Sequence, residues 1–411
     1  MSLPFLTLDD VDVTGKTVLV RVDINSPYDK KTGQLEESER IRAHAQTLRE
    51  LAKKGAKVVV LAHQGRAGGD DFTVLEHHAV LLSKHVHKKV KYVPDILGPT
   101  AIKEITKLKP GKILLLENVR FLAEETLERT PAHHAHSHFV KTLAPLAQLF
   151  VSDAFSAAHR SHASVVGFCA VLPSCAGRVM QREYENISLT SDRAKHPNVY
   201  VLAGAKPDDV FHLLKHGCES SHVDKLLTSG IMGQLCLVAK GYHLGTPTMK
   251  FMEKEGFLKY VEPIRHLLEK YPNKIELPQD LAIERNGQRV EVTLEKLPVS
   301  EVTLDIGSKT AEHYADLIKT AASVYVKGPV GVYEQPNFEL GTREIFQAVA
   351  KSKAFSLMGG GHTVSALNKF KIPPKKIGYI SLAGGALLNY LIHEDLPGLA
   401  ALRESAHHKQ A

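Results

Sequence analysis

The sequence predicts an α/β protein: two doubly wound parallel-sheet domains joined by a helix, with a cleft between them. The length of 411 residues suits two domains of roughly 200 residues each. In both halves, short apolar runs rich in β-branched residues alternate with amphipathic stretches, which is typical of βαβ units. A hydrophobic content of 43% and a charged content of 24% are those of a globular chain with sizeable cores.

The first half supplies the strands and helices of one domain. Its helical segments are expected at residues 40–54 and 74–87, where apolar residues recur at helical spacing. Its expected strands are short apolar runs that alternate with these helical segments, as in a parallel sheet. We expect them at Thr17–Val22, Lys57–Leu61, Val90–Val93, Lys112–Leu116 and Leu149–Ser152.

The second half repeats this scheme, and the polar, helix-prone stretch Arg178–Ser191 is expected to connect the two halves. No short-period repeat is present, so the halves resemble each other only in architecture. The expected strands are Asn198–Leu202, Lys225–Leu227, Lys274–Leu277, Val302–Asp305, Ala322–Val326, Ala354–Met358 and Ile377–Leu382.

Composition narrows the class of protein. Four cysteines without a CxxC pair argue against a zinc site or disulfide framework and favour the reducing cytoplasm. We expect no signal peptide in the acidic N-terminus and no bilayer span, because the longest uncharged run contains Pro173. The histidine-rich stretch 131–138 is expected to be a solvated helix start and not a metal tract. The net charge of +7 suits nucleic acid, an anionic small substrate or a basic surface without a partner.

Basic and hydrogen-bonding residues follow four expected strands of the first half. In an open parallel sheet, ligands bind beyond the carboxyl ends of the strands. Guanidinium groups there bind carboxylate and phosphate in a bidentate fork, so the pattern predicts a small, multiply anionic ligand. The residues are Arg21, Asp23, Asn25, His63, Arg66, Arg120, Asp153, His159, Arg160 and His162.

The second half ends its strands in glycine and lysine. The run GGGHT, residues 359–363, precedes an amphipathic stretch and would place backbone N–H groups at a helix N-terminus, which suits phosphate. Neither a Walker A loop nor a GxGxxG fingerprint is present. Glu334 is a candidate partner for ribose hydroxyls, with a surface or helix-capping carboxylate as the alternative.

Taken in order, these motifs resemble phosphoglycerate kinase, and details such as GGGHT resemble its archaeal type. RVDINSP, ERIR, AHQGR, LLENVRF with an EE pair, and SDAFSAAHRSHAS are similar to the substrate-side motifs. GAK, KGPVGVYE, GGGHT and SLAGGA are similar to the nucleotide-side motifs. The matches run from residue 17 to about residue 386 and cover nearly the whole chain.

The resemblance implies an N-terminal domain that binds 3-phosphoglycerate or 1,3-bisphosphoglycerate. Arg40 would sit at the transferring phosphoryl group, and Arg120 and Arg160 would hold the substrate phosphate. Asp23 and Asn25 would meet the glycerate hydroxyl and carboxylate. The implied substrate-binding set is Asp23, Ile24, Asn25, Arg40, His63, Gln64, Gly65, Arg66, Arg120 and Arg160.

The resemblance also implies a C-terminal domain for Mg-ATP or Mg-ADP, with Lys206 as a catalytic contact to the nucleotide phosphates. Three positions depart from the bacterial and eukaryotic pattern. Val210 replaces a second lysine, Lys327 replaces an asparagine, and His362 replaces a metal-binding aspartate, so Mg²⁺ is expected to be held mainly through the nucleotide and by no protein metal site. The implied nucleotide-binding set is Lys206, Lys327, Glu334, Gly360, Gly361, His362 and Thr363.

The expected organisation is residues 1–175 for the substrate, 176–195 as connecting helix and hinge, and 196–390 for the nucleotide. By resemblance, residues 391–411 return toward the N-terminal domain. The acceptor carboxylate is already ionised at pH 7, so no general base is required, and positioning with charge stabilisation is expected to supply the catalysis. We expect a cytoplasmic monomer or small homo-oligomer that binds neither nucleic acid nor membranes.

Three alternatives stay open from the sequence. The first is a kinase for another carboxylate on the same fold, because fold does not determine substrate. The second is a catalytically impaired nucleotide-binding regulator, suggested by His362 and Val210. The third, a nucleic-acid-binding protein, is disfavoured because aromatics are 6%, tryptophan is absent and the basic residues stand singly.

Overall fold

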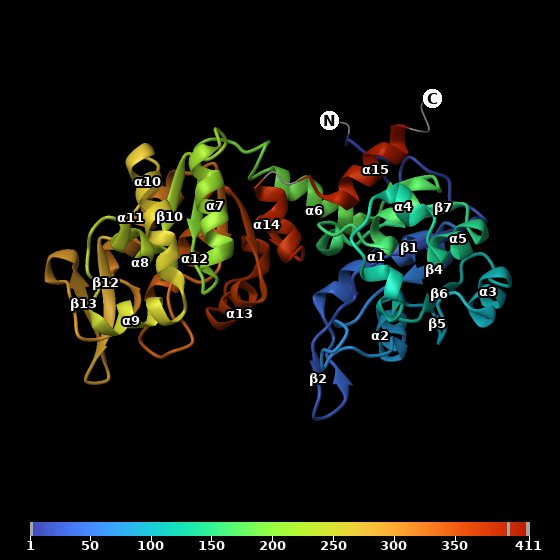
Figure 1. Ribbon diagram of the computed structural model, residues 1–411, viewed down its shortest axis with the longest axis horizontal. Helices are drawn as coiled ribbons and strands as arrows, with labels where there is room; N and C mark the ends of the chain where they lie inside the picture. Colours follow the sequence, from blue (N-terminus) through green and yellow to red (C-terminus); the bar gives the residue numbers. More distant parts are fainter. Residues whose placement is uncertain (1–2, 393–394, 408–411) are drawn as a thin grey trace. The chain divides into compact units, whose positions relative to one another are not determined.

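The computed structural model describes residues 3–392 and 395–407, which fold into two compact units (Figure 1). Residues 3–184 and 395–407 form the first unit, and Glu185–Ile392 form the second. Each unit is built on its own parallel sheet, which confirms the predicted α/β class with two parallel-sheet domains. No helix within the described ranges is both long enough and apolar enough to span a bilayer.

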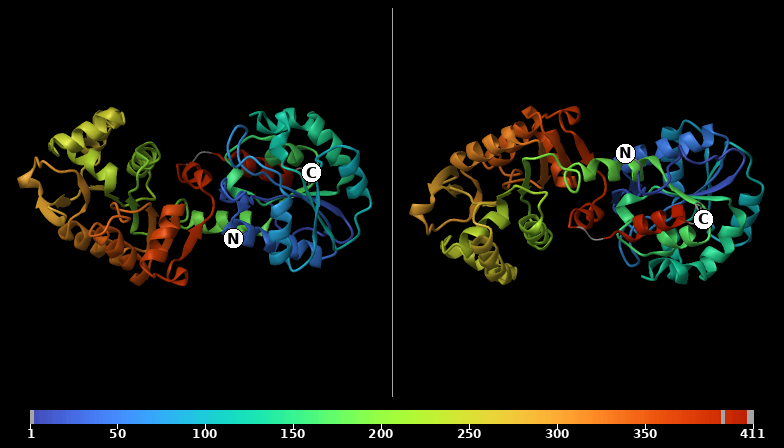
Figure 2. Two further views of the ribbon diagram at one scale, coloured as in Figure 1. Left: turned by 90° about the horizontal axis from the view of Figure 1, so that it is seen from below. Right: turned by 90° about the horizontal axis from the view of Figure 1, so that it is seen from above.

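The first unit contains a parallel sheet that has six strands in the described residues, in the order β5-β6-β4-β1-β7-β8. Helices lie on both of its faces (Figure 2). The strands are β1 (Thr17–Arg21), β4 (Lys57–Leu61), β5 (Val90–Val93), β6 (Ile113–Leu116), β7 (Leu149–Ser152) and β8 (Ser174–Ala176), beside the small pair β2 (Tyr28–Asp29) and β3 (Gln34–Leu35). The helices are α1 (Glu39–Lys53), α2 (Glu76–Val86), α3 (Pro99–Thr106), α4 (Pro131–Ala135), α5 (His138–Leu143) and α15 (Pro397–His407).

Alternate residues of a strand in this unit belong to the buried core on opposite faces of the sheet. Val18 and Val20 of β1 belong to one buried cluster with Ile41 and Leu48 of α1, whereas Leu19 between them is equally buried but outside that cluster. Successive side chains of a strand point to opposite faces, so both faces of the sheet are covered. Because both faces are buried, the strands are largely continuous apolar runs in the sequence.

The second unit repeats the plan with the order β11-β10-β9-β15-β16-β17 in its described residues. These strands are β9 (Asn198–Leu202), β10 (Lys225–Thr228), β11 (Ile275–Glu276), β15 (Ser323–Lys327), β16 (Phe355–Gly359) and β17 (Tyr379–Ser381). The helices are α7 (Pro207–Glu219), α8 (Gly230–Ala239), α9 (Thr246–Lys254), α10 (Val261–Lys270), α11 (Ser308–Thr320), α12 (Leu340–Lys351), α13 (Gly361–Lys369) and α14 (Gly385–Leu391).

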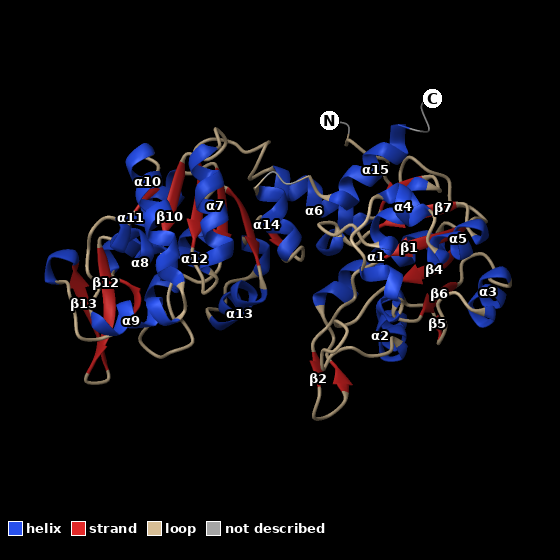
Figure 3. Ribbon diagram, viewed as in Figure 1, coloured by secondary structure: helices blue, strands red, loops and turns tan. Residues whose placement is uncertain are grey.

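One expected strand of the second half lies in a different sheet. β14 (Thr303–Ile306) pairs antiparallel with β12 (Asp280–Arg285), which pairs antiparallel with β13 (Gln288–Thr293) (Figure 3). The turn between β12 and β13 contains Asn286 and Gly287, both with positive φ, as a tight hairpin requires. The expectation that residues 302–305 join the parallel scheme is therefore wrong.

The connecting helix α6 (Arg178–Ser188) begins in the first unit and ends in the second. Its N-terminus is capped by Asp153, whose Oδ1 accepts hydrogen bonds from the N–H groups of Val179 (2.8 Å) and Met180 (3.2 Å). This cap requires glycine at position 177, because a Cβ there would lie 2.3 Å from Asp153 Oδ1. A buried carboxylate thus satisfies the first turn of the helix.

The described part of the predicted C-terminal segment, residues 395–407, belongs to the first unit. The Gly398 N–H donates to Ala158 O at 2.9 Å, which attaches the start of α15 to the segment after β7. Residues 393–394 and 408–411 of that segment lie outside the described residues.

Candidate active site

The predicted substrate-side residues gather at one edge of the first sheet. Strands β6, β4, β1 and β7 are neighbours in the sheet, and all are parallel. The segments that follow their carboxyl ends therefore meet. These segments carry Arg120 after β6, His63 to Arg66 after β4, Asp23 to Asn25 after β1, and Arg160 after β7.

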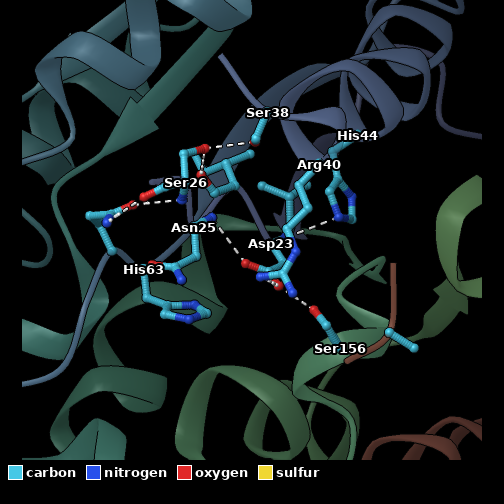
Figure 4. A network of polar contacts seen from close by, with 12 residues as sticks. Asp23, Asn25, Ser26, Ser38, Arg40, His44, His63 and Ser156 are labelled. Carbon is cyan, nitrogen blue, oxygen red and sulfur yellow. Dashed lines mark hydrogen bonds and ion pairs between the residues drawn. The ribbon is translucent and has the colours of Figure 1, made fainter. Parts of the chain in front are cut away.

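Asp23 is the buried centre of this group (Figure 4). Its carboxylate accepts hydrogen bonds from the Asn25 N–H at 3.0 Å and from the Ser156 hydroxyl, and Arg40 Nη1 lies 2.8 Å from its Oδ2. Burial opposes ionisation of Asp23, but the Arg40 guanidinium and the Ser156 hydroxyl outweigh it and hold its pKa below the usual range. Asp23 is an anion that anchors Arg40.

Arg40 is placed by the start of α1. Ser38 caps this helix, accepting the Ile41 N–H at 3.4 Å, and Ser38 Oγ lies 2.7 Å from Ser26 Oγ in the segment after β1. These contacts join the first turn of α1 to that segment. The Arg40 side chain remains 29% exposed, so its guanidinium is both anchored and accessible to a ligand.

His63 is held in one protonation state. Arg21 Nη2 lies 2.8 Å from His63 Nδ1, and because a guanidinium only donates hydrogen bonds, Nδ1 must accept. Burial, followed by the positive charge of Arg21, lowers the pKa of His63 well below its ordinary value. The imidazole is therefore neutral with its proton on Nε2, an arrangement suited to hydrogen bonding a ligand and not to shuttling protons.

Arg120 and Arg160 form a concentration of like charge. Burial, and then the nearby charges of Arg21 and Arg160, lower the pKa of Arg120 to about 10. Within the described residues, the buried Nε of Arg120 has no hydrogen-bond partner, while its Nη1 donates to Gly65 O. A bound anion would reduce the repulsion between the arginines and would accept a hydrogen bond from Arg120 Nε. Arg66, in the segment after β4, is exposed.

Three residues of the implied substrate set lie behind the polar surface. The Ile24 side chain belongs to the apolar core. The buried amide of Gln64 accepts the Ser26 N–H at 2.9 Å and donates to Ser26 O at 3.0 Å. Gly65 has no side chain, and its carbonyl accepts from Arg120. Any contact of Ile24 or Gly65 with a ligand would come from the backbone, and Gln64 supports the segment after β1.

Sequence reasoning missed residues that support this site. Ser156 contacts Asp23 directly, and His44 contacts the Asp23 main chain. His44 stands four residues after Arg40, a spacing that places both on one face of a helix, and that spacing was the available signal. Asp153 was expected at the ligand edge, but its carboxylate caps α6. His134 of the histidine-rich stretch is buried, not solvated, with Nε2 2.8 Å from Ser161 O.

The second unit brings its glycine-rich loops together in the same way. Strands β9, β15 and β16 are adjacent and parallel. A Cβ on Gly328, after β15, would lie 3.1 Å from the Cα of Gly204, after β9, so these two loops pack closely. After β16, Gly360 precedes α13 with a φ of 97°. The first-turn N–H groups of a helix lack partners within it, and here they belong to the GGGHT motif.

The lysines of the second unit differ in accessibility. Lys206 is exposed just before α7. Lys327, at the end of β15, places Nζ 3.5 Å from Asp209 Oδ2 in the first turn of α7. Val210 is fully buried against the core, so the missing second lysine corresponds to a side chain that faces inward. The positive charge of this edge is therefore carried by Lys206 and Lys327.

The groups around the start of α13 suit phosphate better than a metal ion. The His362 side chain is 84% exposed, and its Nδ1 lies 3.8 Å from Glu334 Oε1. Thr363 is buried, and its hydroxyl donates to Gly359 O at 3.0 Å. Mg²⁺ prefers oxygen ligands, and the described residues contain no group of three or more acidic, histidine or cysteine side chains placed to hold a metal. The described residues therefore offer no preassembled set of three such protein ligands, and a magnesium ion here would depend on oxygen ligands from the nucleotide and water.

A sequence model of the family described as "Phosphoglycerate kinase" matches residues 8–394. The chain belongs to the phosphoglycerate kinase family. It is 44% identical to the phosphoglycerate kinase of Methanothermobacter thermautotrophicus over 407 residues, covering 99% of this chain and 98% of that one. It is 42% identical to that of Saccharolobus solfataricus, covering 98% of both. Its relatives are mostly archaeal, in agreement with the predicted type.

Solved structures agree with this assignment. The crystal structure of phosphoglycerate kinase from Pyrococcus horikoshii matches with a TM-score of 0.88 at 36% identity, covering 98% of this chain and 100% of that one. That from Coxiella burnetii matches with a TM-score of 0.85 at 31% identity. The activity is therefore reversible phosphoryl transfer, in which 1,3-bisphosphoglycerate and ADP give 3-phosphoglycerate and ATP. The two alternatives on this fold are not favoured.

Proposed function

We propose that the edge formed by β6, β4, β1 and β7 binds 3-phosphoglycerate, with the carboxylate of that molecule as phosphoryl acceptor. The convergence of four neighbouring strand ends on one basic cluster carries this proposal. Arg120 and Arg160 hold the substrate phosphate, and Asp23 and Asn25 contact the glycerate hydroxyl and carboxylate. His63 donates from Nε2, and Arg66 adds charge at the exposed rim.

Arg40 acts on the group in transit. Its guanidinium is anchored on Asp23 at 2.8 Å, so it is oriented before substrate arrives. Transfer of a phosphoryl group depends mainly on positioning and charge stabilisation, and a preoriented arginine supplies both. The acceptor carboxylate is ionised at neutral pH, so these residues need to move no proton.

The nucleotide belongs to the second unit in this proposal. Lys206 and Lys327 contact its phosphates, and the N–H groups of Gly361, His362 and Thr363 at the start of α13 donate hydrogen bonds to phosphate oxygens. Glu334 binds ribose hydroxyls. Mg²⁺ arrives with the nucleotide and is held mainly by phosphate oxygens and water, because His362 offers no carboxylate. Full activity in excess EDTA would contradict any need for a divalent ion.

We place this activity in the cytoplasm, in a monomer or small homo-oligomer with no nucleic-acid partner. The four cysteines without a CxxC pair suit a reducing compartment. Size-exclusion chromatography with light scattering would determine the oligomeric state.

The substrate site is tested by comparing Arg120→Ala with Arg129→Ala in a coupled assay with 3-phosphoglycerate and ATP. Arg129 is an exposed arginine of the same unit, so both variants lose one positive charge. Loss of a charge-assisted phosphate contact should raise the KM for 3-phosphoglycerate about tenfold or more in Arg120→Ala. The KM for ATP should not change. Equal KM values in the two variants would remove Arg120 from the site.

A further inference from the structure

A buried hydrogen-bond chain runs from the segment after β1 to the connecting helix through His44 of α1. The Asp23 N–H donates to His44 Nε2 at 3.3 Å, and His44 Nδ1 lies 2.9 Å from Asp153 Oδ2. His44 is 2% exposed and Asp153 is 0% exposed. Both ring nitrogens therefore have a protein partner in a site shielded from water.

The chemistry of the partners determines the tautomer of His44. A backbone N–H only donates, so Nε2 must accept and carries no proton. The ring proton then sits on Nδ1 and is donated to the Asp153 carboxylate. Asp153 accepts from His44 with one oxygen and from the N–H groups of Val179 and Met180 with the other.

We propose that His44 is a positioning residue for phosphoryl transfer: it holds the main chain of Asp23, and Asp153 holds His44. Arg40 and His44 lie one turn apart on α1, so the two side chains contact the carboxylate and the backbone of the same residue. Together they set where Asp23 meets the substrate. Since Asp153 also caps α6, this chain ties the position of Asp23 to the N-terminus of the connecting helix.

His44→Phe removes both hydrogen bonds and keeps a ring of similar volume. It should raise the KM for 3-phosphoglycerate about three- to tenfold, because only one of the two lost hydrogen bonds, the one from the Asp23 N–H, holds a proposed substrate residue. The KM for ATP should stay unchanged. His44→Gln offers one acceptor and one donor on a side chain of similar reach, and it should restore the parental KM to within about twofold.

Asp153→Asn tests the tautomer without removing the helix cap. The Asn carbonyl oxygen can still accept from Val179 and Met180, but its amide group then faces His44 Nδ1 as a donor. His44 must shift its proton to Nε2, which then opposes the Asp23 N–H. The KM for 3-phosphoglycerate should rise as in His44→Phe. If His44→Phe does not fold, the KM of Asp153→Asn for 3-phosphoglycerate tests the positioning role of His44 instead.

Thr47→Val is the matched control. Thr47 lies one turn further along α1, is fully buried, and its Oγ1 accepts the Arg178 N–H of α6 at 3.1 Å. It supports the same helix end without contacting Asp23. It should lower thermal stability and leave both KM values unchanged. Equal increases in the KM for 3-phosphoglycerate in Thr47→Val and His44→Phe would overturn the inference, as would an unchanged KM in His44→Phe and in Asp153→Asn.

The inference rests on the proposed role of Asp23, and Asp23→Ala separates the two. If Asp23→Ala leaves the KM for 3-phosphoglycerate unchanged, the proposed substrate site is wrong at Asp23. If that KM rises in Asp23→Ala but not in the His44 and Asp153 variants, the site stands and the positioning role fails.

Discussion

Single charged groups in this protein are held in place before any ligand binds. Arg40 is paired with a buried carboxylate, His63 is kept neutral by burial and by the nearby Arg21, and burial together with neighbouring arginines lowers the pKa of Arg120. The position of Arg120 near Arg21 and Arg160 costs free energy in the empty site, because like charges are kept close together. An anionic substrate offsets that cost, so the same residues favour binding and orientation.

Replacement of Arg40 by alanine should lower turnover by roughly 10³-fold or more with the fold intact. Asp23 keeps hydrogen bonds from Asn25 and Ser156 in this variant, so its segment stays ordered. Steady-state kinetics measure the effect, and circular dichroism checks the fold. Arg42→Ala, on the same helix but paired with Glu37 and Glu39, should behave as the parent. Turnover within tenfold of the parent in Arg40→Ala would show that the assigned role is wrong.

Lys327 and Asp209 should shift nucleotide affinity in opposite directions. Lys327→Ala removes a positive charge and leaves Asp209 without this partner, so the KM for ATP should rise several-fold. Asp209→Asn removes the carboxylate that pairs with Lys327, so the lysine is free to contact the phosphates and the KM for ATP should fall. Kinetics at varied ATP measure both variants. A KM unchanged in Lys327→Ala would leave the lysine as a partner of Asp209 alone.

At the level of elements, the helices and segments around the first sheet bury imidazoles in neutral form. His78 of α2 is fully buried with Nε2 3.0 Å from Gln64 Oε1, and burial lowers its pKa to about 4. Burial also lowers the pKa of His162 to about 3, with Arg160 adding to the effect. The pKa values of His63 and His159 are lowered as well. These elements pack well only while their histidines are uncharged.

Stability should therefore fall on mild acidification. A histidine with a lowered pKa in the folded state binds fewer protons there than in the unfolded chain, so its contribution is complete above pH 6.5 and is lost toward pH 4. For His78 alone the loss at pH 5 is about 2 kcal/mol. Urea unfolding at pH 7 and pH 5 measures the effect. His78→Gln cannot be protonated and should show a smaller pH dependence; an unchanged dependence would exclude His78 as a cause.

At the level of the whole molecule, the two ligands are assigned to separate units. The proposed substrate residues all lie before residue 165 and the proposed nucleotide residues all lie after residue 200. Direct transfer needs reacting atoms about 3–3.5 Å apart. We therefore expect the units to close for the reaction and to open again to admit ligands. Closure also excludes water, which would otherwise compete for the phosphoryl group.

Small-angle scattering tests this motion. The radius of gyration should be smaller with both 3-phosphoglycerate and a nonhydrolysable nucleotide than with either alone, because only the ternary complex has ligands on both units. The ligand-free chain and the two binary complexes serve as controls. Identical profiles in all four states at saturating concentrations would contradict closure.

The two parallel sheets and the helix between them could be predicted from local sequence patterns, and so could the sheet edge at which the proposed substrate residues lie. Continuous apolar runs such as residues 57–61 and 149–152 are local signals of strands buried on both faces, and both runs form the expected strands. Residues after a parallel strand reach the sheet edge wherever that strand lies, so the strand pattern alone predicts that Asp23, His63, Arg120 and Arg160 share one edge.

The pairing of individual side chains could be read only from the folded chain. Gln64 and Asp153 stand in segments that were expected to face a ligand, yet Gln64 hydrogen bonds to Ser26 and Asp153 caps α6. The separate sheet of β12, β13 and β14 also depends on pairing between segments distant in sequence. Local patterns report the burial and direction of a residue, whereas its partner is determined by which other segments pack against it. The link from Asp23 through His44 to Asp153 joins residues up to 130 positions apart, and it exists only in the folded chain.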